Sequence, residues 1–202
     1  RNAGMVDSIL KGVEAPARRS HAYIGGEFQE VEMLQTDEYR SLHPDQVLLT
    51  KDFILEDPQS IRHRDVEVPA PVAGYIQRVD ARNGLVEIRD RPHGDVVARV
   101  RHLSEIAVRE GGNVAYGQSL GQQNNIGIAG LRAGQAIHVH LEMDTRYYQQ
   151  YENYIADLVS GRLPIQAEHR QNVQPLPVAD DGTFRLGESD PRISDLQRVM
   201  TN

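Results

Sequence analysis

Two histidines separated by one residue, His138 and His140, lie inside the otherwise apolar run 137–141. Side chains at positions i and i+2 of a strand point to the same face. Both imidazoles would therefore project together, while the residues that alternate with them enter a core. Neutral imidazole is a metal ligand and a general base, so this pair is a candidate for either role. The alternative interpretation is two solvent-facing histidines on a half-exposed strand.

Further groups of the same chemistry occur earlier in the chain. His102 follows an apolar segment that ends at Val100, and His63 shares a face with Asp65 if that segment is extended. A histidine, a carboxylate and a strand histidine form a three-ligand site with one open position, which is typical of catalytic zinc. Zinc lowers the pKa of its bound water to about 7 and polarises a carbonyl, as peptide hydrolysis requires. Histidines outside the ligand set could orient the water or stabilise the tetrahedral intermediate.

Composition narrows the chemistry. The chain of 202 residues has no cysteine, which excludes disulfides, thiolate metal sites and cysteine nucleophiles. Any metal must be held by His, Asp or Glu, and eight histidines are available. A net charge of -7 argues against nucleic acid as a partner. No apolar stretch reaches the length of about 18 residues that a membrane span needs.

The elements that must position these residues are mostly short strands. Alternating segments separated by Gly, Asn and Pro predict strands at Val66–Val68, Gly74–Val79, Leu85–Ile88, Asp95–Val100 and Ile137–Met143. Asn83-Gly84 predicts a tight hairpin between two of them. The fold class is therefore mainly β, with an antiparallel sheet as the core.

Outside this core, a further strand is possible at Val47–Leu49, and a short helix is expected at Val6–Val13. The period changes to that of a helix over Tyr147–Arg162, and Gly161 is its expected stop. Its apolar face is predicted to hold Tyr147, Tyr151, Tyr154, Ile155, Leu158 and Val159.

Four segments and their order along the chain are informative: Pro69–Ile76, Val100–Leu103, Val108–Gly121 and His138–Glu142. Together they resemble the lysostaphin-type zinc metallopeptidase family, whose members cut the peptides of bacterial peptidoglycan. The resemblance covers roughly residues 63–145. It implies that His140 is a zinc ligand and that His102 and His138 are catalytic.

The first ligand motif departs from the family pattern His-x-Gly-x-Asp, because no histidine before Pro69 has an aspartate four residues later. His63 has Glu67 at that spacing and Asp65 at two residues. The alternation of the segment fits a strand, which favours Asp65 as the carboxylate ligand. Glu67 stays open as the alternative. The predicted ligand set is thus His63, Asp65 and His140.

The resemblance implies a zinc-dependent endopeptidase that acts on peptidoglycan, in the cell envelope or after secretion. The alternative is a degenerate, non-catalytic module of the same fold that binds peptidoglycan or activates another wall hydrolase. Part of the signature also occurs in biotinyl and lipoyl carrier domains. These carriers need a lysine on a hairpin tip, and both lysines, Lys11 and Lys51, lie outside the matching stretch.

Four parts of the chain are predicted. Residues 1–60 form an N-terminal extension and residues 61–162 the metallopeptidase domain. Pro164, Pro175 and Pro177 indicate a linker over 163–186. Residues 187–202 resemble the start of a small helical peptidoglycan-binding domain.

Overall fold

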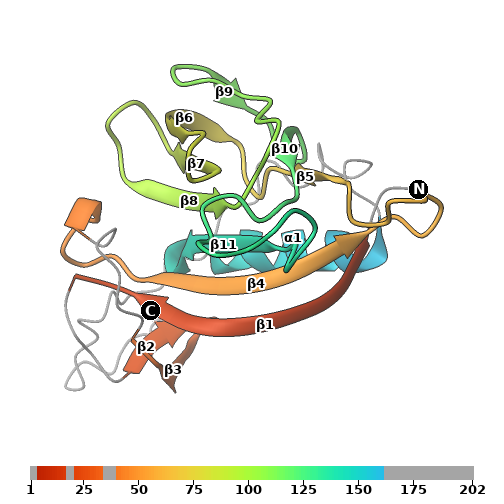
Figure 1. Ribbon diagram of the computed structural model, residues 1–202. Coiled ribbons are helices and arrows are strands. Elements are labelled where there is room, and N and C mark those ends of the chain that lie inside the picture. The colour runs from red at the N-terminus through yellow and green to blue at the C-terminus, as the bar shows by residue number, and fades with distance from the viewer. Residues whose placement is uncertain (1–3, 17–20, 34–39, 162–202) are drawn as a thin grey trace, which may run out of the picture.

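One seven-stranded antiparallel sheet organises the molecule. The computed structural model describes residues 4–16, 21–33 and 40–161. The strand order in this sheet is β1-β4-β11-β8-β7-β6-β9 (Figure 1). The predicted class, mainly antiparallel β with a flanking helix, is confirmed.

The strands form one large sheet and two small sheets. The large sheet contains β1 (Gly4–Glu14), β4 (Leu48–Glu56), β6 (Gly74–Asp80), β7 (Leu85–Arg89), β8 (Val96–Arg101), β9 (Asn113–Val114) and β11 (Val139–Asp144). Two small sheets pair β2 (His21–Ile24) with β3 (Glu27–Glu30) and β5 (Glu67–Pro69) with β10 (Ser119–Gln122). A 3-10 turn (Thr145–Tyr147) leads into α1 (Tyr148–Ser160).

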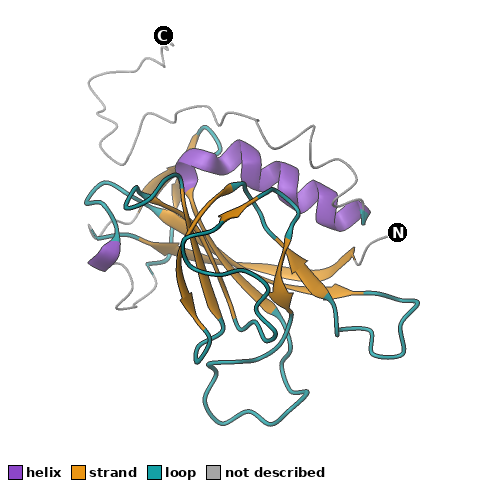
Figure 2. Cartoon of the chain, turned by 90° about the horizontal axis from the view of Figure 1, so that it is seen from above, coloured by secondary structure: helices purple, strands orange, loops and turns teal. Residues whose placement is uncertain are grey.

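The core forms on one face of the large sheet, where helix α1 lies across the strands (Figure 2). Alternation along β11 sends Val139, Leu141 and Met143 into this core, and all three are fully buried. From the helix, Tyr154 packs edge-on against Phe53 and donates a hydrogen bond of 2.6 Å to the carbonyl of Pro69. The opposite face of the sheet is therefore left for the polar residues that alternate with these side chains.

Helix α1 agrees closely with the predicted helix. Gly161 ends it with φ of 69°, a left-handed conformation that glycine adopts without strain. Tyr151, Tyr154 and Leu158 are buried as predicted, but Val159 is 58% exposed. The apolar stripe is thus narrower than predicted.

The helix predicted at Val6–Val13 is wrong, because this segment is part of strand β1. The strand pairs with β4, and the register places Met5 opposite Leu55 and Val13 opposite Leu49. Helix propensity is a weak preference, and pairing with a long neighbouring strand overrides it. β4 itself extends well beyond the predicted Val47–Leu49.

β4 links the predicted N-terminal extension (1–60) to the predicted domain (61–162). It lies within residues 1–60, yet it pairs with β11, from residues 61–162, over six residues. The predicted linker (163–186) and the predicted wall-binding segment (187–202) lie outside the described residues. Within the described part of the chain, no helix has the length and apolarity needed to cross a bilayer.

Candidate functional site

The start of β11 positions the histidine pair on the polar face of the sheet. His140 lies between two neighbours in register, Asp52 on β4 and Arg101 on β8. His138 directly precedes the strand and is attached to the loop before it by a bridge to Asn124. Because the residues between and beyond these histidines are buried on the other face, the core itself orients both imidazoles.

Asp52 is the carboxylate that meets this pair. Its Oδ1 lies 2.9 Å from His140 Nδ1, and its Oδ2 lies 3.8 Å from His138 Nε2. The three side chains keep between 15% and 19% of their surface exposed, so the cluster is reachable from solvent. Sequence reasoning missed Asp52. The feature that could have indicated it is a carboxylate in the middle of the largely apolar run 47–55.

His102 completes the cluster from the end of β8. Its ring centroid lies 4.8 Å from that of His138 and 5.8 Å from that of His140. Its backbone has φ of 73°, a left-handed conformation that is uncommon outside glycine. The structure thus brings together three of the predicted site residues: His102, His138 and His140.

Hydrogen-bond partners determine which ring nitrogens carry protons. His102 Nδ1 lies 2.9 Å from the carbonyl of Ile126, and His138 Nδ1 lies 2.8 Å from the carbonyl of Ala136. A carbonyl only accepts, so both Nδ1 atoms donate, and in the neutral rings both Nε2 atoms carry a lone pair. Burial, with the nearby histidines, lowers the pKa of His102 to about 4, which keeps its ring neutral at pH 7.

His140 is in the opposite protonation state. Its Nδ1 faces Asp52, and its Nε2 lies 2.8 Å from Glu142 Oε2. Both partners are carboxylates, so both ring nitrogens donate and the ring is an imidazolium. Burial alone would lower the pKa of His140, but the hydrogen bonds to Asp52 and Glu142 outweigh it and raise the pKa to about 9.

Glu142 connects the histidines to a buried network of ion pairs. Arg101 Nε donates to its Oε2 over 2.8 Å, and Arg99 Nη1 donates to its Oε1 over 3.2 Å. Arg99 is fully buried and also donates to Glu87 over 3.0 Å. Burial opposes the charge of Glu142, but His140 and the two arginines hold its pKa well below the usual range.

A second group, Glu14, His140 and Glu142, could hold a metal ion. One donor atom from each lies within 4.8 Å of the others, and no other group of three potential ligands in the described residues is as close. Glu14 is 4% exposed, and its Oε1 accepts no hydrogen bond. Burial, followed by the charge of Glu142, raises the pKa of Glu14 to about 7.

Charge balance argues against this buried group as a catalytic centre. When Glu14 is ionised, four carboxylates face four cationic groups here: Glu14, Glu87, Glu142 and Asp52 against Arg89, Arg99, Arg101 and the His140 imidazolium. The network is therefore already neutral with His140 protonated. A divalent ion beside Glu142 would meet two arginines that occupy its carboxylate.

The structure does not bring His63 and Asp65 to His140. Both are exposed, in the turns that follow β4, and Asp65 pairs with Arg62 at 3.4 Å. Backbone bonds within these turns, such as Asp65 N–H to the carbonyl of Arg62, replace the predicted extended segment. Strand structure begins only at Glu67, on β5, which pairs with β10. Neither His63, Asp65 nor Glu67 belongs to the close ligand group.

The residue four positions before Asp52 is Leu48, which is fully buried in a small cluster with Leu42 and Val96. It lies on the same face of β4 as Asp52. No ligand can come from this position, although the His-x-x-x-Asp spacing would place one here. The carboxylate beside His140 thus comes without the histidine that the spacing implies.

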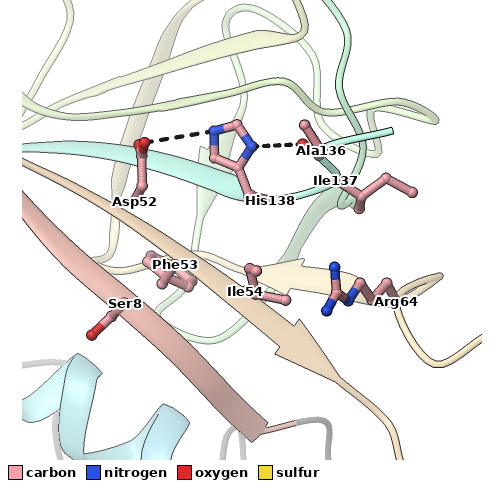
Figure 3. A pocket seen from close by; sticks show the side chains of 8 residues that line it. All are labelled: Ser8, Asp52, Phe53, Ile54, Arg64, Ala136, Ile137 and His138. Atoms are coloured by element: carbon pink, nitrogen blue, oxygen red, sulfur yellow. Dashed lines mark hydrogen bonds and ion pairs between the residues drawn. The ribbon is translucent and has the colours of Figure 1, made fainter. Parts of the chain in front are cut away.

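A cavity of about 490 Å³ adjoins the cluster (Figure 3). Asp52 and His138 form part of its wall. The remaining lining residues are Ser8, Phe53, Ile54, Arg64, Ala136 and Ile137. The volume is in the range of ligand-binding clefts, which hold roughly 300–1,000 Å³. The polar cluster therefore meets a space that a small molecule or a short peptide could enter.

No family model matches the chain, and no curated protein is similar to it.

Proposed function

We propose that this chain is a zinc-dependent endopeptidase that hydrolyses peptide links of bacterial peptidoglycan, in the cell envelope or after secretion. The observation that carries the proposal is the convergence of His102, His138 and His140 with Asp52 beside a cavity. These are the donor types that zinc prefers in hydrolases, and they occur at an accessible place. The order of segments that resembles lysostaphin-type peptidases gives the substrate class.

Asp52, His140 and His138 are the proposed ligands. Asp52 Oδ1 and His140 Nδ1 lie 2.9 Å apart and share a proton, which a zinc ion would have to replace. The three side chains would also have to draw together around the ion, because their ligand atoms do not all lie within 4.8 Å of one another. Leu48 leaves no third donor on β4, whereas His138 Nε2 carries a lone pair and lies 3.8 Å from Asp52. His138 is therefore reassigned from the catalytic role that the sequence suggests to that of third ligand.

A zinc ion held by these residues would polarise the scissile carbonyl and make water nucleophilic near neutral pH. His102 is the proposed general base. Its Nε2 is unprotonated at pH 7, because burial lowers the pKa of the ring. It can accept a proton from the attacking water and pass it to the leaving amine, a function worth roughly 10²–10⁴ in rate.

A non-catalytic module that binds wall peptides is the second candidate. It is favoured by Leu48, which removes one expected ligand, and by the two carboxylates that occupy both nitrogens of His140. A cavity beside a metal-free polar cluster would suffice for binding. This candidate predicts folded protein without zinc and without hydrolysis.

Matched substitutions separate the two candidates. After reconstitution with zinc, we expect about one ion per chain and release of peptide fragments from purified peptidoglycan. Asp52→Asn should lose both, while Asp65→Asn, the same change at the carboxylate predicted from sequence, should retain both. Elemental analysis and chromatography of the fragments measure the outcome. Absence of zinc from folded, unsubstituted protein would overturn the zinc endopeptidase and leave the second candidate.

The roles of two histidines are tested in the same assays. His102→Ala should retain zinc and lose hydrolysis by about 10²-fold or more, since it removes the general base. His138→Ala should lose zinc as well. If His138→Ala retains zinc at full stoichiometry, the third ligand is assigned wrongly.

A further inference from the structure

The cavity beside the polar cluster has chemically distinct ends. Asp52 and His138 lie toward one side in Figure 3, and Arg64 lies toward the other, next to Ile54 and Ile137. Any molecule that fills this space would thus contact the proposed reaction centre, two apolar side chains and a guanidinium. Such an arrangement can select an occupant by its chemistry.

Arg64 is held in place by its backbone and by its side chain. The carbonyl of Arg64 accepts a hydrogen bond of 3.0 Å from Nε2 of Gln123, which is 1% exposed. Gln123 also donates to the carbonyl of Leu55 and accepts from its N–H, so it fixes this loop to the end of β4. The Arg64 side chain donates from Nε to Glu56 Oε2 over 2.9 Å.

That single contact leaves one edge of the guanidinium available. Within the described residues, the Arg64 side chain makes no polar contact besides that to Glu56, and it is 45% exposed. Because only Nε is engaged, the terminal Nη1 and Nη2 groups keep two parallel N–H donors, which is the geometry that a carboxylate accepts as a bidentate partner. A lysine would offer only a point charge at this position.

We propose that Arg64 binds a free carboxylate of the substrate peptide. Ile54 and Ile137 then pack against a small aliphatic side chain, and the bond to be cut lies at Asp52 and His138. This inference rests on the proposed function for the statement that the occupant is a peptide. It adds the specificity: a peptide with a free carboxylate close to the cleavage point, in preference to its amide.

Binding can be measured without any hydrolysis. The probes are N-acetyl-tetra-alanine with a free C-terminal carboxylate and the same peptide as its C-terminal amide. Titration calorimetry on the full chain in EDTA gives both affinities. We expect the carboxylate form to bind at least about tenfold more tightly, because hydrogen bonds to charged groups contribute roughly 1.5–3 kcal/mol.

Three variants identify the residue responsible. Arg64→Gln should bind the two peptides equally, and Arg64→Lys should show a preference between those of wild type and Arg64→Gln. Arg62→Gln is the matched control, because Arg62 is 83% exposed and does not line the cavity. It should keep the full preference. Thermal unfolding checks that each variant is folded, which we expect because an exposed ion pair contributes little to stability.

Several outcomes would overturn the inference: no preference in wild type, no binding of either peptide, or a preference that survives Arg64→Gln. Failure of the proposed function is distinguishable from these. If the chain prefers the carboxylate peptide but never cuts peptidoglycan, the proposed catalysis is wrong and the carboxylate subsite is supported. If the chain cuts peptidoglycan without this preference, only the proposed carboxylate subsite is wrong.

Discussion

At the scale of residues, the three histidines of the cluster differ because their partners differ. His140 faces a carboxylate at each nitrogen and is a cation, whereas the Nδ1 atoms of His102 and His138 face carbonyls. Identical side chains a few ångströms apart thus differ in protonation and in the atoms that they can offer to a ligand. One is held by ion pairs, and two can present lone pairs around Asp52.

The charge on His140 predicts how the metal-free protein responds to alkaline pH. Its folded pKa of about 9 lies above the ordinary value of 6.5. The stabilisation is therefore fully present below pH 6.5 and is lost as the pH rises through about 9. In EDTA, we expect wild type to lose roughly 1–3 kcal/mol more than His140→Gln between pH 6.5 and pH 10. Urea unfolding at both pH values measures the difference, and equal losses would contradict the imidazolium.

At the scale of elements, alternation along each strand divides the sheet into an apolar face and a polar face. β8 contributes Val100 to the core and Arg99 and Arg101 to the polar face, and β11 contributes Leu141 and Glu142 in the same way. Strand β1 adds Glu14 to this polar face. The residue is buried beside Glu142, although its sequence position lies far from the cluster.

Glu14→Gln tests what β1 contributes. Burial and Glu142 raise the folded pKa of Glu14 to about 7, above the ordinary 4.5. The protonated form is favoured, so its contribution is present below pH 4.5 and is lost as the pH rises through about 7. Glutamine carries no charge, so the variant should be more stable than wild type at pH 8.5, by roughly 1–3 kcal/mol, and nearly equal at pH 4.5. Chemical unfolding at the two pH values decides.

The same variant distinguishes the two positions that could hold a metal. Zinc at Asp52, His138 and His140 should bind to Glu14→Gln with unchanged stoichiometry. Loss of zinc from this variant would instead place the ion in the Glu14–His140–Glu142 group. Elemental analysis of folded protein after reconstitution gives the answer.

At the scale of the whole molecule, β4 joins parts that are distant in the chain. It pairs with β1 on one side and with β11 on the other, and it supplies Asp52 to the site and Phe53 to the core. The candidate site and the hydrophobic core therefore depend on the same strand. Residues 61–162 alone lack both Asp52 and Phe53.

A chain that begins at residue 61 should consequently fail to fold. It would leave β11 without one of its partners and would remove Leu49, Phe53 and Leu55 from the core. Large apolar residues in a core contribute about 2–5 kcal/mol each, and for three residues the sum is as large as the usual stability of a domain, about 5–15 kcal/mol. Thermal unfolding followed by circular dichroism should show no cooperative transition. A transition like that of the full chain would contradict this prediction.

Much of the fold was predictable because it depends on local periodicity. The strands at β6, β7, β8 and β11 and the helix α1 occur within one or two residues of their predicted bounds. The pairing of His138 with His140 on one face was predictable for the same reason. β1 was not, because its residues become a strand by hydrogen bonding to β4, a partner that no pattern in β1 reveals.

The sequence by itself determined the mainly β class, the shared face of His138 and His140, and the absence of any thiolate chemistry. Only the tertiary structure decided which carboxylate meets Nδ1 of His140. Asp52 and His140 are 88 residues apart, and the register between β4 and β11 places them opposite each other. Register follows from burying the apolar faces of both strands together, so it belongs to the assembled sheet. The alternation around His63 and Asp65 predicted an extended segment, but this segment forms turns. The two residues therefore do not join His140 in a common ligand group.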